Sequence, residues 1–154
     1  MRLISAIIIA IGLCFATGAS AGYFNSAQLV KVEAVKVKVE ETVAGGCLDN
    51  PDVLKTEAEL VLRRSGIKVV EDTSGHYLNI TVISNAITAD ACAASLDLQV
   101  YGFETLTDGT LGLVEATSQS GLHSGPKGGF PQQLREQVNA KVSKLANEIL
   151  KARQ

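Results

Sequence analysis

An apolar stripe at helical spacing in the last part of the chain constrains the fold most. Pro131 opens a segment in which apolar residues recur every three or four positions, which is typical of an amphipathic helix. Its members are Leu134, Val138, Val142, Leu145 and Ile149. A second, shorter stripe follows Asn50-Pro51, a pair typical of a helix start, and contains Leu54, Ala58, Val61 and Leu62. Two such helices need an apolar surface to cover, and one face of a sheet is the economical solution.

Alternating apolar and polar residues predict the strands of that sheet. Residues 30–39 alternate valine or alanine with charged residues, but the alternation changes parity between Ala34 and Val35, so we expect a bulge or bend there. Further strands are predicted at residues 67–70, 77–84, 95–103 and 111–119, with a hairpin turn at Thr107-Asp108-Gly109. The sequence thus predicts an α+β two-layer sandwich: a mixed four- to five-stranded sheet, two helices on one face, and the order β-α-β-β-β-β-α.

The first 21 residues have the pattern of a secretory signal peptide. Arg2 is followed by an apolar run and then by Ala19-Ser20-Ala21, which is typical of a cleavage site. A spanning helix needs about 20 apolar residues, so a retained anchor is the weaker alternative. Cys14 follows the bulky Leu13 and is interpreted as part of the apolar run, not as a lipidation site. We therefore predict a periplasmic or secreted protein with residues 1–21 removed and residues 22–154 as a single α+β domain.

Export would leave two cysteines, Cys47 and Cys92, in an oxidising compartment. A disulfide between them is predicted, and a reactive thiol is the alternative. The predicted topology argues against the bond, because counting residues 67–70 and 77–84 as full strand crossings after the first helix would place the two cysteines at opposite ends of the sheet. A disulfide requires α-carbons within about 7 Å. Pairing therefore requires that residues 67–70 do not cross the sheet or that the loop around Cys92 folds over.

One block of the sequence resembles a group of known proteins. The residues LVLRRSGIKVV at 60–70, followed by YLNITV at 77–82, resemble small exported bacterial proteins of unknown function. Their arrangement is loosely similar to that of the lipopolysaccharide-assembly lipoprotein. The resemblance covers about a quarter of the chain and implies a layered α+β fold. The chain departs from that lipoprotein because it lacks the cysteine that carries the lipid anchor.

Residues 120–129 contain four glycines and are interpreted as a loop before the final helix. Free amides at the helix entrance and a nearby lysine could hold an anion, so this loop is the first candidate ligand site. Its candidate residues are His123, Ser124, Lys127, Gly128 and Gly129. A hydroxyl or thiol beside His123 could also form a nucleophile and base, but no orienting acid is nearby. An exposed loop without a function is the alternative.

The sequence predicts no catalytic set, no metal site and no cofactor. His76 and His123 are the chain's two histidines and lack zinc-ligand spacing, and tryptophan is absent. The formal net charge of −2 and the lack of a basic run give no indication of a nucleic-acid partner, so none is predicted. No stretch after the signal segment is long or apolar enough to span a membrane.

These features favour a non-enzymatic binding or envelope-associated module of unknown ligand. The alternatives are a small hydrolase using Cys or Ser with His123, and a secreted inhibitor or effector. A protein or envelope component could dock on the edge of the first strand, whose charged residues are Lys31, Glu33, Lys36, Lys38 and Glu40. Protection of that edge against accidental strand pairing is the other interpretation of the same charges.

Overall fold

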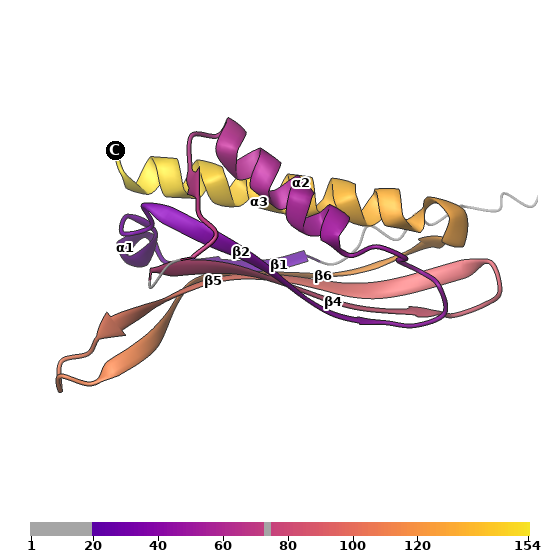
Figure 1. Ribbon diagram of the computed structural model, residues 1–154, viewed down its shortest axis with the longest axis horizontal. Helices are drawn as coiled ribbons and strands as arrows, with labels where there is room; N and C mark the ends of the chain where they lie inside the picture. Colours follow the sequence, from indigo (N-terminus) through magenta and orange to yellow (C-terminus); the bar gives the residue numbers. More distant parts are fainter. Residues whose placement is uncertain (1–19, 73–74) are drawn as a thin grey trace, which may run out of the picture.

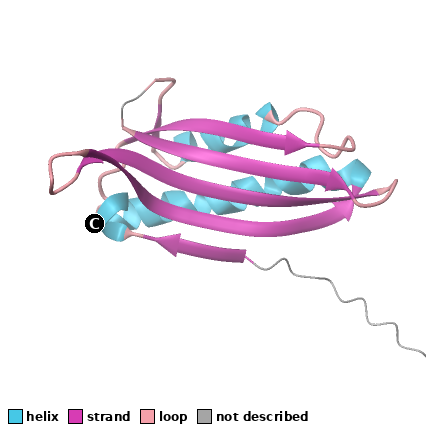
Figure 2. Cartoon of the chain, turned by 90° about the horizontal axis from the view of Figure 1, so that it is seen from below, coloured by secondary structure: helices cyan, strands magenta, loops and turns pink. Residues whose placement is uncertain are grey.

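The computed structural model describes residues 20–72 and 75–154, with side chains described from Gly22 onward. Helices cover one face of a six-stranded sheet and leave the other face open (Figures 1 and 2). The strands are β1 (Ser20–Phe24), β2 (Ala34–Val43), β3 (Lys68–Val69), β4 (His76–Ala86), β5 (Ala91–Thr105) and β6 (Leu111–Pro126). The helices are α1 (Ser26–Leu29), α2 (Asp52–Arg64), the short 3-10 turn η1 (Lys127–Gly129) and α3 (Phe130–Ala152).

The strands are ordered β1-β6-β5-β4-β2-β3 across the sheet. β4, β5 and β6 form an antiparallel meander, whereas β2 runs parallel to both β4 and β3. The predicted α+β two-layer sandwich with a mixed sheet is therefore confirmed. The predicted number of strands, four to five, was too low, because the segment that forms β1 was assigned to the end of the signal peptide and the start of the domain. Two residues of that predicted peptide, Ser20 and Ala21, belong to β1, and residues 1–19 lie outside the described residues.

The core lies between the sheet and the helices. Leu78, Ile80 and Val82 of β4 are fully buried, and they alternate with residues on the open face. The predicted stripe of α3, from Leu134 to Ile149, is also fully buried. Burial of apolar side chains at the predicted spacing explains why the long final helix packs along the sheet. Within the described residues, none of the helices has both the length and the hydropathy that crossing a bilayer requires.

The first predicted strand was placed several residues too early. Residues before Ala34 form α1 and a turn, and β2 begins at Ala34. Val32 is buried from within that turn, while Val35 and Val37 are buried from the strand. The change of parity therefore marks the start of the strand, and the predicted bulge is absent from β2. A β-bulge instead interrupts the pairing of β5 with β6 between Val100 and Tyr101, where Ala116 of β6 is the extra residue.

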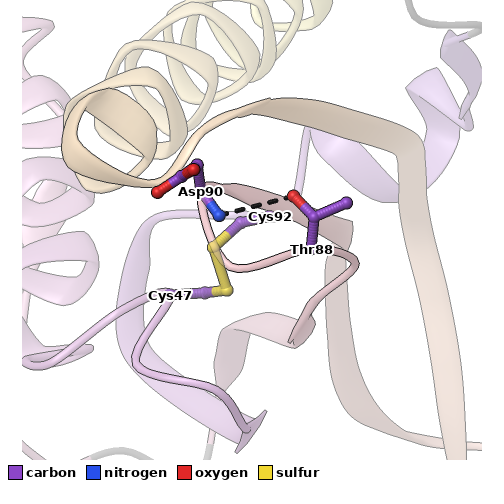
Figure 3. The surroundings of a disulfide bond; sticks show 4 residues. All are labelled: Cys47, Thr88, Asp90 and Cys92. Atoms are coloured by element: carbon purple, nitrogen blue, oxygen red, sulfur yellow. Dashed lines mark hydrogen bonds between the residues drawn. A yellow bond between two sulfur atoms is a disulfide. The ribbon is translucent and has the colours of Figure 1, made fainter.

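The structure joins Cys47 to Cys92, with 5.8 Å between the α-carbons (Figure 3). β3 is only two residues long and pairs beside the start of β2, so it does not cross the sheet. β4 then runs parallel to β2, so the C-terminal ends of both strands lie at the same end of the sheet. Cys47 follows β2, and Cys92 lies at the start of β5 directly after the β4–β5 turn. The predicted separation of the two cysteines was therefore wrong, because residues 67–70 do not make a full crossing of the sheet.

Candidate functional site

The predicted glycine-rich loop is mostly a strand. Residues up to Pro126 extend β6, and the final residues of the predicted loop form η1. Gly121 and Gly125 face α3, whose polar side chains approach the strand closely. A β-carbon on Gly125 would lie 2.4 Å from Oε1 of Gln133, so glycine is needed for this packing. These glycines therefore bring the helix close to the strand and do not indicate an irregular loop.

β6 places the residues proposed for a hydrolase, His123 and the neighbouring serines, on opposite faces of the sheet. His123 faces α3, whereas Ser124 next to it faces the open side, as alternation along a strand requires. Ser120 also lies on the open side, three residues from His123. Both cysteines are fully buried in the disulfide. The structure therefore brings neither a hydroxyl on the open side nor a free thiol to the imidazole of His123.

The remaining candidate residues lie at the entrance to α3. The backbone N–H of Lys127 donates a hydrogen bond to the carbonyl of Asp90 at 2.8 Å, which ties η1 to the β4–β5 turn. Gly128 and Gly129 are exposed in the same turn. The anion site predicted for these residues stays a prediction. Among the described residues, no cluster of three or more His, Cys, Asp or Glu side chains could hold a metal ion.

A buried polar cluster lies between β6 and α3. Gln119 is 3% exposed and donates a hydrogen bond to the carbonyl of Lys141 at 3.2 Å. The ammonium of Lys141 donates a hydrogen bond to the carbonyl of Ser120 at 3.0 Å, and its burial lowers the lysine pKa. Gly121 leaves room there for the side chains of Lys141 and His123. This cluster was not predicted from the sequence; the available signal was the alternation of polar residues with glycine at every second position, in Gln119, Gly121, His123 and Gly125.

The two histidines favour the neutral form in the folded protein. Burial lowers the pKa of His123 below its ordinary value of 6.5, and the positive charge of Lys141 lowers it further. Burial also lowers the pKa of His76, although Glu104 partly opposes that shift. The unfolded chain therefore takes up protons first as pH falls below 6.5, so acidification favours unfolding.

We expect the free energy of unfolding to fall between pH 7 and pH 5, before the carboxylates titrate. His123→Gln should make this fall shallower, because one of the two shifted groups is removed. Urea unfolding midpoints at several pH values in this window measure the effect. A midpoint that stays constant for the wild type, or a slope that is identical in His123→Gln, would contradict this assignment.

A polar groove lies on the helical side, between α2 and α3. Its lining residues are Glu57, Gln132, Arg135, Glu136 and Asn139. Glu57 accepts hydrogen bonds from Asn139 at 2.7 Å and from Arg135 at 3.1 Å, and the Asn139 bond is the main cause of its lowered pKa. These groups satisfy one another across the two helices. The groove is therefore best interpreted as a helix–helix contact.

The open face of the sheet carries a row of polar side chains in register across four strands. The row consists of Lys38, Asn79, Gln99 and Ser118. Asn79 is only 7% exposed; its amide donates to the hydroxyl of Thr81 at 3.3 Å, while its Oδ1 accepts no hydrogen bond from the described residues. Gln99, directly opposite, is exposed. A nearly buried acceptor without a partner is uncommon in folded proteins, and it distinguishes Asn79 from the other residues of this row.

Aromatic side chains stand next to this row on the same face. The rings of Tyr77 and Tyr101 stack across β4 and β5 with centroids 5.5 Å apart. Phe103 contacts Tyr77 edge to face at 6.4 Å, and the ammonium of Lys38 lies 4.8 Å from the Tyr77 ring centroid. Tyr23 of β1 is 56% exposed on this face. From the sequence, 77–84 and 95–103 were predicted as strands, but the two tyrosines were not recognised as neighbours.

The edge of β2, predicted as a docking surface, is partly covered. β3 pairs with β2 only at Ala34 and Val35, and no other described strand pairs along this outer edge. Lys31, before the strand, is bound to Glu104 of β5 at 2.9 Å. Lys36 and Lys38 belong to the open face, opposite Tyr77 and Asn79. A partner on this edge stays a prediction, and the open face contains two of the lysines that suggested it.

The fold and the exposed polar face define a small α+β module with one uncovered sheet surface.

No family model and no curated protein matches the sequence. Among solved structures, a PelC variant dodecamer from Paraburkholderia phytofirmans has 14% identity and a TM-score of 0.56, covering 84% of this chain and 97% of that one. A minor lipoprotein from Acinetobacter baumannii has 11% identity and a TM-score of 0.40, covering 77% and 90%. The rare lipoprotein B from Shewanella oneidensis has 9% identity and a TM-score of 0.30, covering 76% and 92%. The chain shares its fold with PelC, and at these identities the likeness concerns the fold alone.

Proposed function

We propose that this protein is an exported, non-enzymatic binding module that acts at the cell envelope through the open face of its sheet. The observation that carries the proposal is the polar row on that face, where the exposed amide of Gln99 lies beside the buried Oδ1 of Asn79, an acceptor without a partner among the described residues. Amide groups supply donors and acceptors together, and the neighbouring tyrosines add apolar contact area. The ligand that fits is a polar molecule with both hydrogen-bond donors and acceptors.

Export is supported by two independent features. Residues 1–21 have the charge, the apolar run and the small residues of a signal peptide. The Cys47–Cys92 bond is fully buried, and structural disulfides of this kind persist mainly in oxidising compartments. A protein of this design acts in the periplasm or outside the cell.

The fold similarity to PelC supports an assembly of several copies. The PelC structure is a dodecamer, and repeated copies of one weak site would increase overall affinity without new contacts. The hydrolase alternative is disfavoured because His123 and its serine neighbours lie on opposite faces of β6. An inhibitor or effector would use the same face but would retain a soluble protein and not an envelope component.

The test uses two matched glutamine substitutions on opposite layers. Protein recovered from exporting cells is immobilised and exposed to detergent-solubilised envelope material. Gln99→Arg places a long charged side chain on the open face, whereas Gln132→Arg makes the same change on the exposed side of α3. We expect the wild type and Gln132→Arg to retain the same envelope component, and Gln99→Arg to retain about tenfold less or none.

Two results would contradict this proposal. Absence of any retained envelope component would exclude an envelope ligand, and equal retention by all three proteins would exclude the open face as its site. Intact mass of the recovered protein checks export separately. It should begin at Gly22 and carry the disulfide.

A further inference from the structure

The β5–β6 hairpin extends beyond the rest of the sheet (Figure 1). Pairing between β4 and β5 ends at His76 and Gly102, but β5 and β6 stay paired as far as Thr105 and Leu111. On the helical side the base of the hairpin is braced by the ion pair between Lys31 and Glu104 at 2.9 Å. The hairpin therefore forms an arm with a defined position relative to the sheet.

One side of this arm is apolar and uncovered. Phe103, Leu111 and Leu113 are 48%, 71% and 61% exposed, and they form what we call the hairpin patch. Phe103 pairs with Leu113 in register, and Leu111 pairs with Thr105 two residues further along, so all three face the same way. Contact between Phe103 and Tyr77 shows that this is the open side of the sheet. Adjacent large apolar side chains with this exposure are typical of an interaction surface.

The charges of the arm argue against a lipid surface as the occupant. Asp108 lies in the turn at the tip, and hydrogen bonds from Thr110 lower its pKa. Insertion of the tip into a bilayer would have to bury this charged group. Residues 102–126 contain no lysine or arginine that could hold anionic headgroups. An apolar side with a charged tip fits a partner that docks side-on.

The chain itself carries a surface complementary to the arm. Lys36 and Lys38 of β2 lie on the open face, level with Tyr77 and Asn79 at the base of the arm. The acids near them are Asp72, which is 3.8 Å from the Lys36 ammonium and almost fully exposed, and Glu115, which lies opposite Tyr101. Both lysines therefore lie on the same face as the hairpin patch, and the acidic tip lies at the arm's other end. Two arms placed face to face in opposite directions bring the tip of each copy toward the base of the other. The resulting contacts are reciprocal, as a two-fold interface requires.

We infer that the hairpin patch binds a second copy of this chain, with the two arms antiparallel and Asp108 of each copy near Lys36 and Lys38 of the other. The inference deepens the proposed function by naming the contact between copies. It does not depend on an envelope ligand. The pairing buries Phe103, Leu111 and Leu113 of both copies and places opposite charges at both ends of the contact.

The first test measures the mass of the purified protein in solution by analytical ultracentrifugation, without envelope material. We expect the wild type to self-associate, and the Leu111→Ser/Leu113→Ser variant to raise the dissociation constant at least about tenfold. Leu122→Ser is the matched control, because Leu122 lies on the open face of β6 outside the arm and is 69% exposed. It should associate like the wild type. Thermal melting should show that all three proteins fold.

A charge-reversal cycle tests the orientation of the two arms. Asp108→Lys and Lys38→Glu should each weaken association, and the two changes combined should recover part of it, because the contact between positions 108 and 38 is re-formed with exchanged signs while Lys36 is unchanged. If the single variants associated weakly because they were misfolded, the double variant would not regain association.

Four results would overturn the inference. The wild type could stay monomeric up to about 100 µM, a concentration at which even a weak specific interface is occupied. The serine variant could associate as strongly as Leu122→Ser, or the combined charge reversal could recover none of the lost association. Sedimentation with vesicles of zwitterionic phospholipid is the third measurement; binding that is lost in the serine variant would assign the patch to lipid. None of these results affects the retention experiment, which a monomer can also pass.

Discussion

Replacing both Cys47 and Cys92 by serine should lower the free energy of unfolding by about 4 kcal/mol. The bond links residues 45 positions apart, and its loss returns to the unfolded chain the freedom that the closed loop removes. For a domain of this size the melting temperature should fall by about 15 °C. This is a large share of the stability of a typical domain. Thermal melting and urea unfolding of the double variant beside the wild type measure the effect.

The burial of the bond gives this prediction a control. Both cysteines have no exposed surface, so a reductant reaches the sulfur atoms only when the protein opens. Native protein incubated with dithiothreitol should therefore resist alkylation, whereas the same protein in urea should be reduced and alkylated at both positions. Alkylation of native protein without reductant would show free thiols. An unchanged melting temperature in the double serine variant would show that the bond does not stabilise the fold.

Local periodicity was sufficient to predict the elements that form the core. The stripe of α3 and the alternation in β4 depend on neighbours within a few residues, and both are buried as predicted. Errors occurred where the structure depends on distant segments. Residues 120–126 have the composition of a loop, but β5 pairs with all of them and holds them in a strand. Their glycines are explained by α3, a helix that begins only later in the chain.

The predicted candidate site shows the same limit. His123 and Ser124 were grouped because they are adjacent in sequence, yet neighbours in a strand face opposite sides of the sheet. The residues that share the open face come from strands far apart in the sequence. Asn79 and Gln99 become neighbours only through the β4–β5 register, and Lys38 joins them only because β2 pairs parallel to β4. Register and strand order are not contained in a local pattern, so this surface could not be predicted from the sequence.

Phe130→Ala should lower the free energy of unfolding by about 4 kcal/mol. Phe130 is the first residue of α3 and is fully buried, close to the helix-facing side of Gly125. Removing its ring leaves a cavity at the point where β6, η1 and α3 meet. That junction fixes the start of the helix, so neighbouring side chains cannot close the space easily. Urea unfolding at neutral pH measures the loss.

Phe103→Ala is the matched control, because the same ring is removed from a site that is 48% exposed on the hairpin arm. Its effect on stability should stay below about 1 kcal/mol, since water already reaches much of the side chain. The same substitution should weaken self-association, because Phe103 belongs to the hairpin patch. The two phenylalanines therefore separate the surface that holds the fold together from the surface that is available to a partner. Equal loss of stability at both positions would show that the arm is part of the hydrophobic core. A small loss at Phe130 would show that side chains at the start of α3 can repack.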